Sequence, residues 1–284
     1  MENELTERQL ACIPNAHFKL IPIKDLVSNQ DYQRPLSENH ILKAIEEFDV
    51  YQINPVKVSR RDGINYVFDG QHTIEIVASK SGSRDTPVWC MVFEELQYCE
   101  EAHIFAEQQK HVKSLMPYEV FNAHLEAGDK KQLMIVNLVQ SYGLDVSGSQ
   151  KPGSICAVSA LEYIYDKYGY HVLDQAICLL VATWEGEANS LSANMLKGVA
   201  RIISTFGDSL KEDMFKEHVG KYSVKMIMRN AKERHPGALG VAEAMLIAYN
   251  SKNKYRLPMR KLYGKTMTDD LEDETDDDDY EETI

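Results

Sequence analysis

Tyr66-Val67-Phe68-Asp69-Gly70-Gln71-His72-Thr73 decides how the first third of the chain folds. The string begins as an apolar, aromatic-rich run typical of a strand, and a helix is predicted over 71–79, just after the glycine. Gly70 can turn the backbone sharply and lets a bound group approach it closely. Because the free N–H groups and the dipole at the start of a helix attract anions, the string predicts a phosphate or other anion site.

The segments around this corner predict an α+β domain. Ser37 has the side chain of a helix N-cap, and the Asp62-Gly63 pair is typical of a hairpin turn because glycine adopts positive φ without a clash. Strands are expected at 18–23, 55–58, 64–68 and 88–93, and helices at 37–48, 71–79, 98–113 and 117–127, the last with Pro117 in its first turn.

The remainder of the chain has a different pattern. From Lys130 onward, apolar residues recur at helical spacing in almost every segment, which predicts a compact all-helical domain. The expected organisation is an N-terminal extension at 1–17, an α+β domain at 18–128, a helical domain at 129–265 and a disordered acidic tail at 266–284.

The net charge of −13 comes mostly from the C-terminal tail, because 269–282 contains eleven acidic residues and no basic one. Without that stretch, the chain has 31 basic and 33 acidic residues. Like charges at this density repel and bury no apolar surface, so the tail is predicted to be disordered. It either serves solubility or acts as a DNA mimic that occupies a basic groove, on this protein or on a protein partner.

Composition limits the cellular setting. The N-terminus lacks an apolar run behind a basic cluster, and the longest apolar run, 176–184, is too short to span a membrane. The five cysteines are scattered without a Cys-x-x-Cys pair, which favours reduced, buried side chains over disulfides or zinc. We therefore expect a cytoplasmic protein with no membrane partner.

Several motifs, in the same order, resemble the ParB/sulfiredoxin superfamily. Residues 29–34 share the first Asn and the last Arg of its Asn-Pro-x-Gln-Pro-Arg box, and 66–73 stand where ParB has Gly-Glu-Arg-Arg. The segment 52–58 resembles the entry to the family's hairpin, and 115–119 resembles its Leu-x-Pro-x-Glu segment. The resemblance covers about a third of the chain and implies a ParB/sulfiredoxin-like N-terminal domain.

The resemblance implies that this domain binds a nucleotide, CTP or ATP, or a phosphate group. Gln71 stands where sulfiredoxin has its catalytic cysteine, which argues against that activity. The two arginines with which ParB grips phosphates are replaced as well. The residues implied for binding are Arg34, Gly70, Gln71, His72, Thr73, Gln108 and Gln109.

Gln108 and Gln109 stand at the Glu-Asn pair of a second ParB motif, although a slip of one residue would make Glu107 or Lys113 the equivalents. A glutamine lacks the negative charge that favours Mg²⁺. Mg²⁺ therefore stays a candidate cofactor, but magnesium-dependent hydrolysis of CTP is in doubt.

A second hypothesis is a metal-assisted nuclease or nucleotide hydrolase with the same fold. Asp69, His72 and Glu107 would be its catalytic residues. Against it, Asp69 is better interpreted as a cap of the helix after Gly70. His103, Glu107 and His111 share a helical face, but they extend over two turns, so we predict a solvated face and no metal site.

The helical half contains a basic stripe that would suit DNA. Lys221, Lys225, Arg229 and Lys232 follow each other at spacings of four, four and three along one predicted helix, where they either contact phosphates or form a solvated face. The favoured interpretation is a ParB-like, nucleic-acid-associated homo-oligomer from a phage, plasmid or other mobile element. A third hypothesis is a catalytically silent adaptor that binds a partner through the acidic tail.

Overall fold

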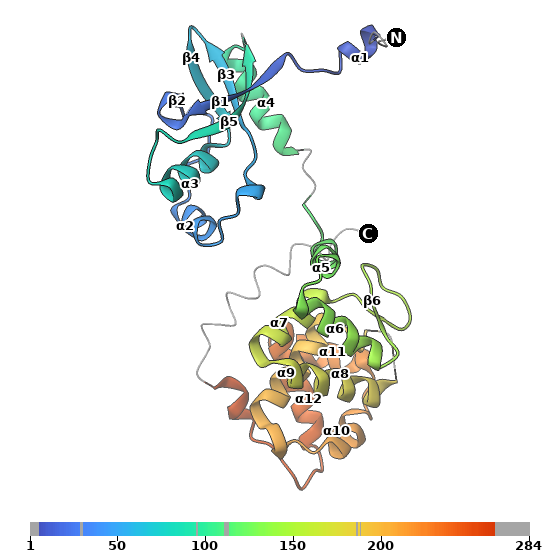
Figure 1. The fold of residues 1–284 in the computed structure, drawn as a ribbon. Helices are drawn as coiled ribbons and strands as arrows, with labels where there is room; N and C mark the ends of the chain where they lie inside the picture. Colours follow the sequence, from blue (N-terminus) through green and yellow to red (C-terminus); the bar gives the residue numbers. More distant parts are fainter. Residues whose placement is uncertain are drawn as a thin grey trace. The chain divides into compact units, whose positions relative to one another are not determined.

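The computed structural model describes residues 6–28, 31–94, 96–110, 114–185, 187 and 189–264. The chain forms two compact units, 1–114 and 115–284 (Figure 1). This boundary differs from the predicted one at 128. Helix α5 (Pro117–Glu126) belongs to the second unit, because its Phe121 is buried in the core of that unit.

The first unit is built on a five-stranded mixed sheet with the order β1-β5-β3-β4-β2. Its outer pair β1–β5 and its central hairpin β3–β4 are antiparallel, whereas β5–β3 and β4–β2 are parallel. The α+β prediction for this part of the chain is confirmed. The strands are β1 (Ala16–Pro22), β2 (Leu26–Val27), β3 (Val56–Arg61), β4 (Ile64–Asp69) and β5 (Pro87–Glu94).

The predicted hairpin turn is also confirmed. Asp62 and Gly63 both have positive φ, 50° and 78°, and Arg61 pairs with Ile64 at the end of the ladder. Two left-handed residues match the twist of the flanking strands, which is why Asp-Gly suits this turn.

Helices cover both faces of the sheet. On one face, Ile74 and Ala78 of α3 (Gln71–Ser81) pack into a core with Val58, Cys90 and other strand residues. On the other face, α4 (Tyr98–Lys110) lies against β3 and β4. Around them lie α1 (Glu7–Leu10), α2 (Glu38–Glu46), η1 (Ile23–Asp25) and η2 (Val50–Gln52).

Gly70 fixes the corner between β4 and α3. Its φ is +100°, and a Cβ atom at this position would lie 3.2 Å from the Cα atom of Val56 on the neighbouring strand. The glycine is therefore required for positive φ and for close packing against β3.

The second unit is mainly helical, and α12 lies at its centre, where Met245 and Tyr249 are fully buried. Its other helices are α6 (Lys130–Ser141), α7 (Val158–Tyr168), α8 (Tyr170–Trp184), α9 (Ala193–Phe206), α10 (Glu212–Val219), α11 (Val224–Lys232), α12 (Gly237–Asn250), η3 (Gly207–Ser209) and η4 (Met259–Tyr263). The acidic tail, predicted at 266–284, lies outside the described residues.

Two sequence predictions need correction. The second unit is not purely helical, because β6 (Asp145–Val146) and β7 (Ser154–Ile155) form a short parallel pair. The cysteines are free, but Cys12 and Cys99 are exposed rather than packed in a core. Among the residues that the structure describes, no helix is both long enough and apolar enough to cross a membrane.

Substitution of the two glycines that cap α3, Gly70 and Gly82, should lower the stability of the first unit by different amounts. Gly70→Ala should lower the free energy of unfolding of the first unit by roughly 2–4 kcal/mol. The cost of a left-handed alanine adds to the cost of the overpacked contact with Val56. Gly82→Ala, at the other end of α3, has φ +70° and no atom within 4 Å of the new Cβ, so its cost should be about 1 kcal/mol. Native-state hydrogen exchange of β3 and β4 amides would measure both. Equal losses would contradict the packing role of Gly70.

Candidate functional site

The start of α3 is joined to the segment before α2 by the side chain of Gln71. This side chain is only 7% exposed, and its Nε2 atom donates a hydrogen bond of 2.6 Å to the backbone carbonyl of Arg34. Gln33 Nε2 donates in the same way to the carbonyl of Val67 on β4, at 3.0 Å. The two amides therefore hold residues 33 and 34 beside the β4–α3 corner.

His72 makes the next link along the same segment. Its Nε2 atom accepts a hydrogen bond of 3.1 Å from the backbone N–H of Ser37, and its ring lies edge-on to His40 at 5.5 Å. Burial, followed by the nearby His40 and Arg34, lowers the pKa of His72 below its usual 6.5. His72 is thus a neutral acceptor near pH 7. Ser37 itself caps α2 as predicted, since its Oγ atom accepts from the N–H of His40.

Beside these links, α3 starts with backbone N–H groups that lack a helical acceptor. The first helical hydrogen bond runs from the N–H of Ile74 to the carbonyl of Gly70. Gly70 is the N-cap and has no side chain that could accept from the N–H groups before Ile74. Within the described residues, the N–H groups of 71–73 have no acceptor. The Arg34 side chain is exposed, and its charge is near enough to lower the pKa of His72. The structure therefore brings Arg34, Gly70, Gln71, His72 and Thr73 together.

The predicted role of Asp69 as a helix cap is wrong. The N-cap of α3 is Gly70, and no side chain caps this end of the helix. Instead, Asp69 Oδ2 lies 3.5 Å from the Nζ atom of Lys57, its register partner on β3.

The three predicted catalytic residues have separate partners. Asp69 pairs with Lys57, His72 accepts from Ser37, and Glu107 pairs with Lys110 at 2.5 Å. Among the described residues, no hydrogen bond joins any two of the three. The structure does not assemble them as an acid–base group.

Lys57 is a site residue that the sequence interpretation missed. Its Nζ atom donates a 2.7 Å hydrogen bond to Gln108 Oε1, so Lys57 connects Asp69 on β4 with Gln108 on α4. In the described structure the buried Nε2 atom of Gln108 has no partner. A lysine flanked by two valines in a buried strand was the available signal. The side chain of Gln109 lies outside the described residues.

A buried ion pair places α4 relative to this end of the sheet. Glu101 is fully buried, and its Oε1 atom lies 2.9 Å from Nε of Arg61, although the N–H does not point at that oxygen. Tyr32 OH donates to Glu101 Oε2 at 3.3 Å, and burial beside this carboxylate raises the pKa of Tyr32 above its usual 10. The Arg61 guanidinium also stacks 4.2 Å from the ring centre of Tyr66.

The candidate metal ligands do not form a cluster among the described residues either. No group of three or more His, Cys, Asp or Glu side chains suited to a metal ion occurs in the described part of the chain. His103 and Glu107 lie on α4, and His111 lies outside the described residues.

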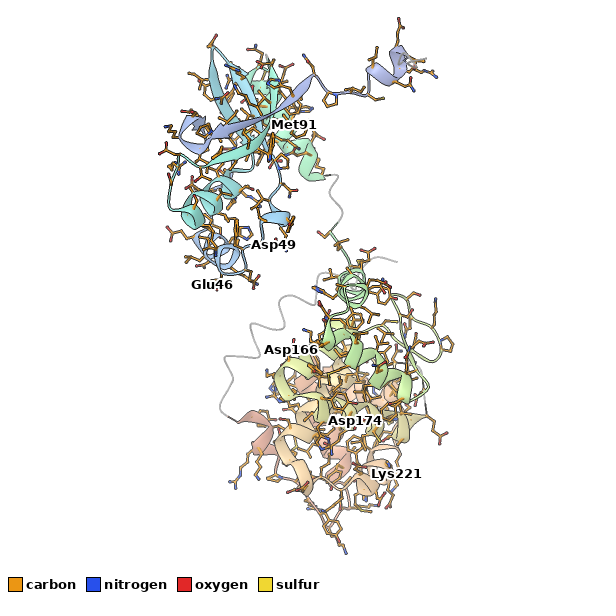
Figure 2. The ribbon with its side chains drawn as sticks, viewed as in Figure 1. Glu46, Asp49, Met91, Asp166, Asp174 and Lys221 are labelled. Carbon is orange, nitrogen blue, oxygen red and sulfur yellow. The ribbon has the colours of Figure 1, made fainter. Side chains whose placement is uncertain are left out.

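The basic stripe of the second unit is shorter than predicted. Lys225, Arg229 and Lys232 lie on α11 and are exposed, but Lys221 lies in the turn before the helix and pairs with Glu217 at 3.5 Å (Figure 2). Helices α10 and α11 are joined by the four residues 220–223, and both pack against α12. A glycine within that turn and the Ser223 N-cap after it were the sequence signals for the break between the two helices.

A family model described as "Family of unknown function (DUF6551)" matches residues 27–261, which is most of the chain. The chain belongs to this family. No curated protein matches it.

Among solved structures, this DUF6551 protein is similar to the C-terminally truncated chromosome-partitioning protein ParB from Caulobacter crescentus, complexed with CTP-gamma-S. The identity is 13%, the TM-score is 0.32, and the likeness covers 81% of this chain and 99% of that one.

His72 gives the DUF6551 chain a predicted pH dependence. A histidine titrates near 6.5 in an unfolded chain, and in the fold the pKa of His72 is lower. Its contribution to stability is therefore complete above about pH 6.5 and decreases as the pH falls toward the folded pKa. An NMR titration of the His72 ring should have its midpoint below that of an unfolded peptide.

His72→Gln should flatten the loss of first-unit stability at acidic pH, because an amide oxygen accepts from Ser37 without titrating. His103→Gln, on the exposed side of α4, serves as the control and should leave the loss unchanged. If both variants keep the wild-type pH profile, His72 does not control it.

Proposed function

We propose that the first unit binds a nucleotide, CTP or ATP, through its phosphates at the start of α3. The observation that carries this proposal is the combination of acceptor-free amides at 71–73 with the Arg34 backbone tethered beside them by Gln71. A phosphate there would accept hydrogen bonds from the amides, meet the positive end of the helix dipole and be reached by a guanidinium.

Gln71 and His72 fit such a site because their side chains hold its backbone in place. In the proposal, Gln71 and His72 do not grip the phosphates, because their polar atoms already hold Arg34 and Ser37. They fix the loop that carries the single guanidinium. This arrangement lowers the entropy lost when a ligand binds, since the loop is already ordered.

Binding has more support than hydrolysis. Asp69 and Glu107, which would have to bind a metal ion or activate water, are each paired with a lysine. A metal ion such as Mg²⁺ would have to displace Lys57 from Asp69. In this proposal the nucleotide is a ligand of the already ordered first unit of a ParB-like protein of a mobile element.

The exposed cations of α11 favour DNA as the partner of the second unit. Lys225, Arg229 and Lys232 recur at i, i+4 and i+7, so they lie along one side of α11. Within the described chain they have no ion pair, so each is available to a phosphate.

Arg34 provides the test of nucleotide binding. CTP or ATP at saturating concentration should raise the melting temperature of the wild-type protein, because a ligand of the native state stabilises it. Arg34→Ala should weaken the affinity on the order of tenfold by removing a charge-assisted contact, as measured by calorimetric titration.

Arg84→Ala is the matched control, because it removes an exposed guanidinium of the same unit that pairs with Glu75 instead. Its affinity should stay at the wild-type value. Equal losses in the two variants, or no stabilisation by any nucleotide with or without Mg²⁺, would refute the proposed pocket.

The α11 stripe provides a separate test. Lys225→Ala and Arg229→Ala should each weaken binding of duplex DNA and reduce the slope of log affinity against log salt by about 1. Lys221→Ala should leave that slope unchanged, since this lysine lies off the helix. Fluorescence anisotropy across salt concentrations distinguishes these outcomes. A Lys221 effect as large as the other two would contradict the assignment of the stripe to α11.

A further inference from the structure

One side of the outer strand pair of the first unit carries exposed apolar side chains. Every second residue of β5 packs in the core under α3, so Trp89 and Met91 point to the opposite side of the sheet. On the edge strand β1, Leu20 and Phe18 are the register partners of Trp89 and Met91. Cross-strand partners point to the same side, so these four residues form one surface, which we call the outer face.

The outer face lies beyond the part of the sheet that α4 covers. Helix α4 lies against β3 and β4, and at the margin of this covered part the Phe93 ring packs 5.6 Å from that of Phe68. Further out, Phe18 is 61% exposed and Trp89 is 55% exposed. These two rings alone expose on the order of 200 Å² of apolar surface. Contiguous exposed apolar surface of this kind marks an interaction site.

The segment before β1 is a second apolar feature that its own fold leaves exposed. Every residue from 6 to 15 is exposed, and we call this range the N-terminal arm. Leu10 and Ile13, three positions apart, are 54% and 55% exposed. The helical turn α1 is nevertheless formed, because Thr6 and Gln9 make a capping box. The arm therefore presents a formed turn and two apolar side chains to another surface.

The N-terminal arm does not cover the outer face of its own chain. It enters β1 at Ala16, whereas Phe18 and Leu20 lie further along the strand. To cover them, the arm would have to reverse its direction at 14–16. There a hydrogen bond of 2.8 Å from the N–H of Ala16 to the carbonyl of Pro14 closes a three-residue turn. The arm of a second copy can approach the same face without this reversal.

The edge of β1 is a poor contact between copies. Lys19 projects from the side of β1 opposite to the outer face, and Pro22 has no N–H to donate to an added strand. A lysine and a proline are typical of sheet edges that resist pairing with another strand. The outer face itself contains no charged side chain, so it suits the apolar residues of the arm.

We propose that the N-terminal arm of a second copy of this chain packs on the outer face, so that each copy covers the other. An exchange of this kind about a two-fold axis is isologous, because the same arm and the same face are used twice. The contact does not include the start of α3. It can therefore fail or succeed independently of the proposed nucleotide site.

The available area fits a stable dimer. The exposed apolar side chains that each copy contributes are Leu10, Ile13, Phe18, Leu20 and Trp89. Each is about half exposed, and together they amount to roughly 400 Å² per copy. A standard interface buries about 800 Å² per partner, of which a little over half is apolar. The arm and the outer face together therefore supply most of the apolar surface that such an interface needs.

The native Cys12 allows a direct test in the full-length protein, because it is exposed within the N-terminal arm. Leu20→Cys should form a disulfide-linked dimer under mild oxidation, since a disulfide requires the two Cα atoms to come within about 7 Å. The added substitution Cys12→Ser should abolish it. Leu42→Cys, at an exposed leucine of α2, is the matched control and should give several-fold less dimer.

Peptide mapping by mass spectrometry identifies which thiols are joined, because Cys99 is exposed as well. A disulfide between positions 12 and 20 of different chains supports the proposal. The same disulfide within one chain would assign the outer face to the chain's own arm. Either that result, or no disulfide between these positions, overturns the inference.

Sedimentation equilibrium gives a second readout without oxidation. The wild-type protein should dimerise at micromolar concentration, and Trp89→Ala should weaken the dimer on the order of tenfold, because aromatic side chains dominate such contacts. Leu10→Ser with Ile13→Ser should weaken it as much. Tyr51→Ala removes a 95% exposed ring elsewhere in the first unit and should leave it unchanged. A monomeric wild type, or a dimer that tolerates the Trp89 and arm variants, would contradict the exchange.

Discussion

The hydrogen bond from the Gln71 amide to the carbonyl of Arg34 organises the first unit around its candidate site. It joins two segments that are far apart in sequence, and the donor is almost fully buried. A buried amide that loses its acceptor costs about 1–3 kcal/mol, so the loop is strongly held. The proposed binding of phosphate requires the guanidinium of Arg34 to reach the start of α3, and this hydrogen bond holds the Arg34 backbone there.

The neighbouring polar contacts act in the same direction. His72 holds Ser37, and the buried Glu101 holds Arg61 together with Tyr32. Residues 32, 33, 34 and 37 are thus tied to α4, β4 or α3. These contacts occupy groups that could otherwise bind a ligand. They leave the amides of α3 and the side chain of Arg34 for that purpose, which is the reason for proposing binding without hydrolysis.

The second unit distributes its charge over two separate surfaces. The cations of α11 are exposed along one side of that helix, whereas Lys167 of α7 and Lys197 of α9 both lie against the ring of Tyr163.

The sequence by itself determined the strand–glycine–helix corner, the Asp-Gly hairpin and the Ser37 cap, because these depend on local backbone preferences. The order of motifs, through a family resemblance, predicted one site for Arg34 and residues 70–73, and the hydrogen bond from Gln71 to the Arg34 carbonyl holds these two segments together. Only the tertiary structure decided that Asp69 faces Lys57, that Lys57 reaches Gln108, and that Gln71 holds a backbone carbonyl instead of a ligand. These contacts join residues 12 to 51 positions apart, and no local pattern records which of several polar partners a folded chain brings within reach.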